Sequence, residues 1–271
     1  MFERRQVFLR PRKDLGQCFL NNSHIAEPAA EHARGRRVLE LGPGYGMLTH
    51  ELCRNAESVV AVEIDRNLFS ALSREGITNL RLVNKDFFRA SDGELGIGKV
   101  DIMISNVPYD LSSKVIDFII SRRLEAVLYL QKEFVERMTA SPGTRNYSRL
   151  SVMSQLCLSI TKIMDVGRGN FEPVPKVDSA LVYLKPKSSA ISDVEKEAIA
   201  LLMQHKKKTV RNALLDSLRH LDGGREAAGA LAKDLAERNE RVFKLSPEEL
   251  LSLAKRIGPS LRSMAPGTGR V

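Results

Sequence analysis

The sequence predicts an α/β fold with a mainly parallel sheet, followed by a small helical domain. Three observations lead to this prediction. An apolar run is followed by a glycine-rich turn and a helix-like pattern over residues 36–53. Apolar runs then alternate with helical patterns as far as residue 131, and strands that alternate with helices form parallel sheets covered on both faces. Beyond residue 193 only helical patterns remain.

The predicted strands are short apolar runs, each bounded by a turn or a charged residue. After the first strand and its helix, further strands are expected at 57–65, 80–86, 100–105 and 126–131, with helices at 66–75 and 112–124. The last two apolar runs, 160–167 and 179–186, have no clear helix between them. We therefore expect an antiparallel pair at one edge of the sheet.

Proline, serine and charged residues cluster in residues 185–193, which is typical of a linker. Helical patterns follow at 194–221, 225–240 and 246–257. Ser246 and Glu249 have the spacing of a capping box, and Pro247 suits the first helical position. The tail 258–271 is expected to fray. We accordingly divide the chain into a domain of residues 1–187 and a helical domain of residues 188–271.

The composition excludes several classes of protein. Of 271 residues, 43% are hydrophobic, which is enough for a core and argues against general disorder. Three separated cysteines fit reduced thiols in the cytoplasm better than a disulfide framework. Neither a signal peptide nor a membrane span is expected. The five histidines lack metal-ligand spacing, so no metal is predicted. A net charge of +9 suggests a polyanionic partner.

Distinctive residues follow the first three predicted strands. Gly42 and Gly44 belong to a GxGxG turn, which differs from the GxGxxG turn that cradles a pyrophosphate. Glu63 ends the second strand and can accept both hydroxyls of a ribose, and Asp86 ends the third and can accept from an exocyclic amine. Ligands bind at the carboxyl ends of parallel strands. The pattern therefore predicts an adenosine pocket without a phosphate cradle, which suits S-adenosylmethionine better than NAD or ATP.

Two points in this pocket remain open. The glycine turn could serve only the tight packing of a strand against a helix. Glu40, inside the first strand, could face the pocket or only order the loop.

The fourth strand ends in Asn106-Val107-Pro108-Tyr109. The adenine amino nitrogen is a poor nucleophile because its lone pair is delocalised into the ring, so methyl transfer to it requires positioning more than a strong base. The Asn106 side-chain oxygen can accept one N–H, and Pro108 can hold the turn so that the Val107 carbonyl accepts the other. Tyr109 offers a ring on which a base can stack. An ordinary turn is the alternative, since asparagine, proline and tyrosine are common in loops.

At these residues the chain resembles the small-subunit ribosomal RNA adenine N6,N6-dimethyltransferases, most closely their archaeal branch. The resemblance covers nearly the whole chain. It rests on "DLGQCFL" (14–20), "VLELGPGYGMLT" (38–49), "VEID" (62–65), "NVPYDLSS" (106–113), "LQKEFVERMTASPGTRNYSRLSV" (130–152), "FEPVPKVDSALV" (171–182) and "QHKKKTVRNAL" (204–214). It implies a Rossmann-like class I S-adenosylmethionine-dependent methyltransferase fold, with a catalytic domain at 1–187 and an RNA-binding or ribosome-binding domain at 188–271.

The resemblance also implies roles for individual residues. The N-terminal segment, with Gln17, Cys18 and Leu20, would fold over the cofactor. Further cofactor contacts would come from Gly42, Gly44, Glu63, Asp86 and Asn106. Tyr109 and Phe171 would sandwich the target adenine. From the residues alone, Phe171 between prolines reads as a loop anchor. Where family members commonly have Asn, Gly and Gly, this chain has Cys18, Lys85 and Ser148.

Basic residues cluster near both ends of the chain, and the implied partner is small-subunit rRNA in an immature 30S subunit. Such clusters can follow phosphates, although a charge run is often only a solvated helix face. The predicted RNA contacts are Arg12, Lys13, Lys206, Lys207, Lys208 and Arg211. Lys207 and Arg211 have i,i+4 spacing, which would make a coherent stripe on a helix. A monomer is expected.

Three other functions are compatible with parts of this pattern. A DNA adenine methyltransferase is disfavoured because Val107 stands where those enzymes more often have a second proline. A large-subunit rRNA methylase of the antibiotic-resistance type is closer, but the "QHKKKTVRNALLDS" block favours the small subunit. A non-catalytic assembly factor is disfavoured because Asn106, Tyr109, Glu63 and Asp86 are all present.

Overall fold

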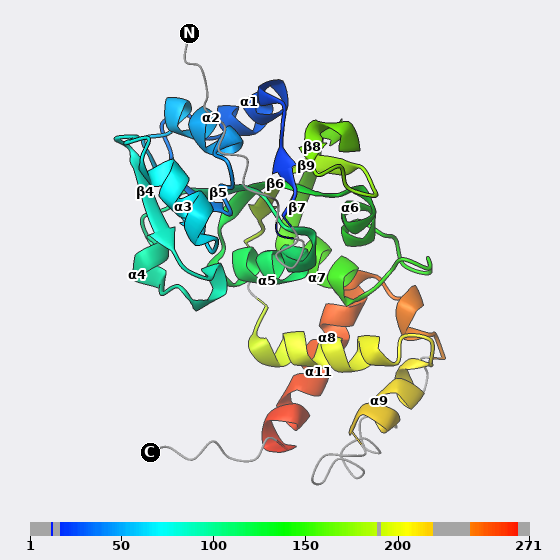
Figure 1. The fold of residues 1–271 in the computed structure, drawn as a ribbon. Coiled ribbons are helices and arrows are strands. Elements are labelled where there is room, and N and C mark those ends of the chain that lie inside the picture. Colours follow the sequence, from blue (N-terminus) through cyan, green and yellow to red (C-terminus); the bar gives the residue numbers. More distant parts are fainter. Residues whose placement is uncertain (1–11, 13–16, 189–190, 219–238, 265–271) are drawn as a thin grey trace, which may run out of the picture. The chain divides into compact units, whose positions relative to one another are not determined.

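The structure is a computed structural model that describes residues 12, 17–188, 191–218 and 239–264, with side chains as far as residue 261 (Figure 1). The chain forms two compact units. The first contains residues 1–135 and 160–186, and the second contains residues 136–159 and 187–271. The predicted boundary between residues 187 and 188 lies one residue from a unit boundary, whereas residues 136–159 group with the helical unit.

The first unit is built on a seven-stranded sheet of order β4-β3-β2-β5-β6-β9-β7. Five strands are parallel neighbours: β4 (Leu80–Asn84), β3 (Ser58–Glu63), β2 (Arg37–Leu41), β5 (Ile102–Asn106) and β6 (Glu125–Gln131). β9 (Ser179–Pro186) runs antiparallel to β6, and β7 (Leu158–Val166) lies at the edge beyond it. The two late strands are neighbours at one edge of the sheet, as predicted, with the later strand as the inner one.

The parallel strands are connected by α2 (Met47–Asn55), α3 (Arg66–Ser73), α4 (Asp92–Leu95) and α5 (Ser112–Arg122). Short 3-10 turns occur at Phe87–Arg89, Tyr109–Leu111, Arg168–Asn170 and Val242–Lys244. Residues Leu39, Ile102, Met103, Ile104 and Leu128 are fully buried within the sheet. These continuous apolar runs are typical of strands covered on both faces. The α/β prediction is therefore confirmed.

Two elements that the sequence pattern did not reveal hold the N-terminal region. Helix α1 (Ser23–Glu31) begins at Asn22, whose side chain accepts a hydrogen bond from the His24 backbone N–H. β1 (Phe19–Leu20) pairs antiparallel with β8 (Phe171–Glu172) in a two-stranded ribbon. A strand of two residues is too short to show a periodic pattern in the sequence. β1 can therefore be recognised only from its pairing with β8 in the structure.

The second unit is helical and contains α7 (Arg149–Cys157), α8 (Asp193–Gln204), α9 (Val210–Leu218) and α11 (Pro247–Met264). α6 (Lys132–Met138) spans the boundary between the units. The single helix predicted at 194–221 is wrong, because it is interrupted between α8 and α9. Backbone groups in the interruption pair instead with residues 240–243: the Phe243 N–H donates to Lys206 O at 2.9 Å, and the Val242 N–H to Lys208 O at 3.0 Å.

The predicted capping box at the last helix is confirmed, since the Ser246 N–H donates to Glu249 Oε2 at 2.9 Å and the Glu249 N–H to Ser246 Oγ at 3.2 Å. The predicted fraying from residue 258 is wrong as far as Met264, because α11 continues and buries Ile257 and Leu261. Residues 265–271 and most of the helix predicted at 225–240 lie outside the described residues. Among the described residues, no helix combines the length and apolarity needed to cross a membrane.

Candidate functional site

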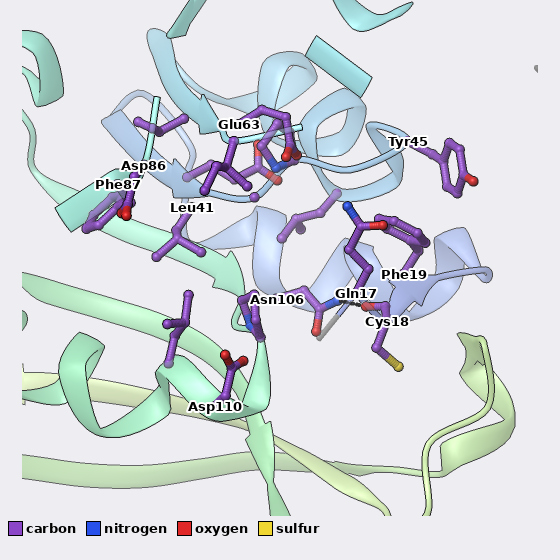
Figure 2. Close-up of a pocket in the computed structure, with 18 of the residues that line it drawn as sticks. Gln17, Cys18, Phe19, Leu41, Tyr45, Glu63, Asp86, Phe87, Asn106 and Asp110 are labelled. Carbon is purple, nitrogen blue, oxygen red and sulfur yellow. Dashed lines mark hydrogen bonds between the residues drawn. The ribbon is translucent and has the colours of Figure 1, made fainter. Parts of the chain in front are cut away.

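A pocket of about 230 Å³ lies at the carboxyl ends of β2, β3, β4 and β5. Its lining includes residues from all four strand ends and from the N-terminal segment: Gln17, Cys18, Phe19, Leu20, Glu40, Gly42, Tyr45, Glu63, Ile64, Asp86, Phe88, Asn106, Pro108, Asp110 and Lys114. Figure 2 shows Glu63 and Asn106 on facing sides of this pocket, with Asp86 towards one end and Gln17 towards the other. The pocket lies where the parallel topology predicts it.

The glycine turn between β2 and α2 brings the N-terminal segment close to the loop backbone. Gly44 has a φ of +57°, and a Cβ atom there would lie 2.5 Å from the Phe19 ring. The Phe19 ring in turn packs against Tyr45, with 4.4 Å between the ring centroids. Gly44 lies outside the pocket lining but donates its N–H to Glu63 Oε2 at 3.1 Å. The turn therefore serves packing and also orients a carboxylate.

Glu63 is a nearly buried carboxylate at the end of β3. Its Oε1 accepts from the Asp65 N–H at 2.8 Å, and its Oε2 accepts from Gly44. Burial is the main effect on this side chain and raises its pKa above the ordinary value, while the backbone donors act in the opposite direction. Two carboxylate oxygens offer about four acceptor positions, so hydroxyl groups of a ligand can still be accepted.

Asp86 follows β4 and caps the next turn, with Oδ1 accepting from the Phe88 N–H at 2.9 Å. Its side chain remains about 41% exposed, so it keeps acceptor positions towards the pocket. Lys85, which precedes it in place of the family's usual glycine, forms an ion pair with Glu94 at 3.0 Å. The substitution therefore leaves the predicted carboxylate in place.

Glu40 carries a buried carboxyl oxygen without a protein partner. Only 1% of this residue is exposed, and its Oε2 has no hydrogen bond within the described part of the chain. Burial raises the pKa of Glu40 to about 8. Because Glu40 lines the pocket, the open question from the sequence is answered in favour of the pocket. A buried acceptor without a partner is costly, and a cationic group of a ligand would satisfy it.

Asn106 is the last residue of β5 and is fixed by the N-terminal segment. Its Nδ2 donates to the Cys18 carbonyl oxygen at 2.7 Å, so the amide nitrogen is engaged and Oδ1 remains the acceptor. Pro108 also lines the pocket, whereas the Val107 side chain is buried. Tyr109 lies outside the lining, and its hydroxyl forms a hydrogen bond with Ser179 Oγ at 2.9 Å.

The N-terminal segment lines one side of the pocket through Gln17, Cys18 and Leu20. These are the three residues of this segment that were predicted to contact the cofactor. Gln17 Oε1 accepts from the Arg12 N–H at 2.7 Å. The Cys18 thiol donates to the Pro173 carbonyl at 3.2 Å, and burial raises the pKa of Cys18 to about 11. Cysteine at this position therefore keeps a side-chain hydrogen bond.

Phe171 is fully buried and does not line the pocket, whereas a sandwich with Tyr109 needs an open face of its ring. Its side chain is fully buried in the core of the first unit, and its backbone pairs with Leu20 in the β1–β8 ribbon. Neither face of the ring is available to an adenine in this arrangement. The placement matches the loop-anchor interpretation.

The predicted RNA-binding lysines differ in their surroundings. Lys206 is half-buried and its Nζ donates to the Tyr147 carbonyl, whereas Lys208 is exposed although its Nζ pairs with Asp216. Lys207 and Arg211 are exposed, but Lys207 lies in the interruption between α8 and α9, so the predicted helical stripe is wrong. Arg12 is exposed, and Lys13 lies outside the described residues.

Three segments of the second unit are joined by hydrogen bonds into what we call the basic node: residues 141–149, 205–211 and 240–245. The Gly143 N–H donates to Phe243 O at 2.7 Å, and the Tyr147 hydroxyl donates to Leu245 O at 2.9 Å. The exposed basic residues of the node are Arg145, Arg149, Lys207, Lys208, Arg211, Arg241 and Lys244. Its single acidic residue is Glu240. The sequence analysis missed four of these because they are scattered along the chain.

Comparisons with known proteins agree with this geometry. Residues 9–258 match the family described as Ribosomal RNA adenine dimethylase. A protein of Thermococcus gammatolerans named "Probable ribosomal RNA small subunit methyltransferase A" is 39% identical over 90% of this chain and 88% of its own length. One of the same name from Methanopyrus kandleri is 38% identical, covering 93% of this chain and 94% of its own.

Two solved structures are similar over most of the chain. A dimethyladenosine transferase from Plasmodium falciparum has a TM-score of 0.75 and 30% identity, covering 89% of this chain and 98% of its own. The 23S rRNA methyltransferase ErmE has a TM-score of 0.61 and 27% identity, covering 88% of this chain and 98% of its own.

Proposed function

Because this chain belongs to the ribosomal RNA adenine dimethylase family, we propose that it transfers methyl groups from S-adenosylmethionine to N6 of two adjacent adenosines near the 3′ end of small-subunit rRNA. One observation carries the proposal. A pocket lined by four carboxyl groups ends at an asparagine whose amide oxygen is left as an acceptor.

The pocket residues suit this cofactor in charge and in hydrogen-bonding capacity. Glu63 would accept the ribose hydroxyls, and Asp86 would accept the adenine amine. Glu40 offers a buried carboxyl oxygen without a hydrogen bond in the described part of the chain, which suits the positively charged methionine end. When bound, the cofactor supplies an electrophilic methyl group on a sulfonium, which is already a good leaving group. The protein therefore has to orient the nucleophile more than to activate it.

Asn106 would orient that nucleophile. With Nδ2 donating to Cys18, the amide is held with Oδ1 free to accept a hydrogen from the target amino group. This contact would draw the nitrogen lone pair out of conjugation with the ring and would stabilise the positive charge that develops there. The Val107 carbonyl would accept the second hydrogen from the rigid turn before Pro108.

Tyr109 would provide the stacking surface for the target base, which must leave its own helix or loop to reach the site. Burial raises the pKa of Tyr109 above its ordinary value, so the ring remains a neutral phenol at physiological pH. The face of a tyrosine ring attracts positive charge, so it can stabilise a base that becomes positively charged during transfer.

The basic node would bind rRNA phosphates. Its three segments carry seven exposed cationic side chains and one acidic residue, and among the cations Lys208 is paired with Asp216. Such an excess strengthens binding to any polyanion and makes it sensitive to salt. We further propose that the substrate is an immature 30S subunit, that the protein acts in the cytoplasm, and that it does so as a monomer.

Methylation of large-subunit rRNA is the second candidate, favoured by the similarity to ErmE. To distinguish the two functions, the protein is incubated with labelled S-adenosylmethionine and, in parallel reactions, with undermethylated small subunits, large subunits or DNA. Labelled N6,N6-dimethyladenosine in small-subunit rRNA is the expected result. Label only in large-subunit rRNA or in DNA would reject the proposal, and no label in any of them would favour a non-catalytic assembly factor.

A further inference from the structure

Tyr109 is held at its hydroxyl end by a residue that no sequence argument singled out. Ser179 is the first residue of β9, and none of its surface is exposed. Its Oγ lies 2.9 Å from the Tyr109 hydroxyl. The backbone of Ser179 is fixed in turn, because it lies opposite Gln131 in the antiparallel ladder between β6 and β9. The phenol is therefore tied to a buried residue of the central sheet.

The same phenol is connected to Asn106 through Cys18. The Cys18 thiol contacts the Tyr109 hydroxyl and donates to the Pro173 carbonyl at 3.2 Å. The backbone oxygen of Cys18 accepts a hydrogen bond from Asn106 Nδ2 at 2.7 Å. Ser179, Tyr109, Cys18 and Asn106 thus form a continuous series of contacts from the sheet to the pocket.

We propose that Ser179 is a positioning residue for methyl transfer, which fixes the Tyr109 ring and, through Cys18, the Asn106 amide. This inference rests on the proposed function. A tyrosine ring after a proline turn can rotate about two side-chain bonds, and a single hydrogen bond at its far end selects one orientation. The ring is then ready for the target base before RNA arrives, which affects the rate of transfer more than ground-state affinity.

The test compares Ser179→Ala, Tyr109→Phe and the double variant in the small-subunit assay. Each single change removes one end of the same hydrogen bond, so we expect each to lower kcat by about tenfold. KM for RNA and for cofactor should change much less. The double variant should be no slower than the slower single variant, because the two residues act through one contact. Ser179→Thr, which keeps a hydroxyl, should recover most of the rate.

Ser151→Ala is the matched control, since Ser151 is also fully buried and donates its hydroxyl to a backbone carbonyl, that of Arg137. It should lower the melting temperature as Ser179→Ala does, with kcat unchanged. Equal losses of kcat in both serine variants would show that Ser179 contributes only to stability and has no positioning role. Multiplying losses in the double variant would also overturn the inference.

A measurement without substrate keeps this inference separate from the proposed function. In protein labelled with ¹³C at the tyrosine ζ-carbons, the Tyr109 signal is assigned from its loss in Tyr109→Phe. Ser179→Ala should shift this signal and leave the other tyrosines in place. An unmoved Tyr109 signal would overturn the positioning role even if the enzyme is active. A shifted signal in a protein that methylates no RNA would instead reject the proposed function alone.

Discussion

The cofactor pocket of the first unit and the basic node of the second unit use charge in opposite ways. The pocket contains four carboxyl groups, of which Glu40 and Glu63 are almost completely buried. The node contains eight lysine and arginine side chains, of which all but Lys206 are exposed. A buried charge must find a partner at a specific place, whereas exposed charges act together over distance and are screened by salt. Changes in the pocket should therefore have large and specific effects, and single changes in the node small and additive ones.

The largest effect is expected at Asn106. Asn106→Ala removes the acceptor for the target amine and the donor to Cys18, and we expect kcat to fall by about 100-fold or more. RNA binding, measured by filter retention, should be unchanged because Asn106 is not part of the node. Undiminished turnover would remove this residue from its proposed role.

Glu63→Ala should mainly weaken cofactor binding, by about 10- to 100-fold in Kd by calorimetry, because a charged acceptor for ribose hydroxyls is lost. The melting temperature should also fall, since the Gly44 and Asp65 N–H groups lose their acceptor. Glu57→Gln, at an exposed glutamate of the same unit, is the control. Equal affinities of the two variants would contradict the assignment of the pocket.

Replacing Lys207 and Arg211 together with alanine should weaken RNA binding by about tenfold at moderate salt and lower the salt slope by about two. Cofactor affinity should be unaffected. Lys196→Ala is the matched control, because Lys196 is paired with Asp193 on a helix of the same unit. An unchanged salt slope in the double variant would show that Lys207 and Arg211 do not contact RNA phosphates.

Glu40 makes a smaller, pH-dependent contribution. Its pKa is about 8 in the fold and near the ordinary 4.5 when unfolded, so between these values the folded state holds the extra proton. This carboxyl therefore lowers the stability of the cofactor-free protein as pH rises from about 4.5 to about 8. Glu63 adds a change in the same direction, since its pKa is also raised.

The difference between wild type and Glu40→Gln isolates the Glu40 contribution. In the wild type, binding of the cationic cofactor near pH 7 should release a proton, because the positive charge favours the ionised carboxylate. Calorimetry in two buffers of different ionisation enthalpy measures this release, and Glu40→Gln should abolish it. Equal proton release in both proteins would show that Glu40 does not lose a proton when the cofactor binds.

The smallest effect is expected at Lys206. Its ammonium donates to the Tyr147 carbonyl inside the node, so Lys206→Ala should lower the free energy of unfolding by about 1 kcal/mol. RNA affinity should fall less than in Lys207→Ala, where the side chain is exposed. A larger loss of RNA affinity in Lys206→Ala than in Lys207→Ala would show that Lys206, and not Lys207, makes the stronger contact with RNA.

Local pattern was enough to predict much of the fold. The parallel strands appear as apolar runs because both faces of the sheet are covered, and their carboxyl ends share one edge. Gly42, Glu63, Asp86 and Asn106 could therefore be placed at one pocket without coordinates. The last helix was equally predictable at its start, since the contacts between Ser246 and Glu249 span a single turn.

Features that depend on distant segments could not be predicted in the same way. The lysine run at 206–208 has a helical pattern, but its backbone pairs with residues 242 and 243 instead. Phe171 lies between charged and proline-rich positions, yet its pairing with Leu20 buries it. Ser179 gives no local signal, because its partner Tyr109 is 70 residues away.

The sequence by itself determined the sheet, the strand ends and the family, because side-chain periodicity and turn chemistry act over a few residues. Only the tertiary structure decided which acceptors are left without partners, as at Glu40, and which end of the Asn106 amide is free. Hydrogen bonds between segments far apart in the chain settle those questions, and no local pattern encodes them.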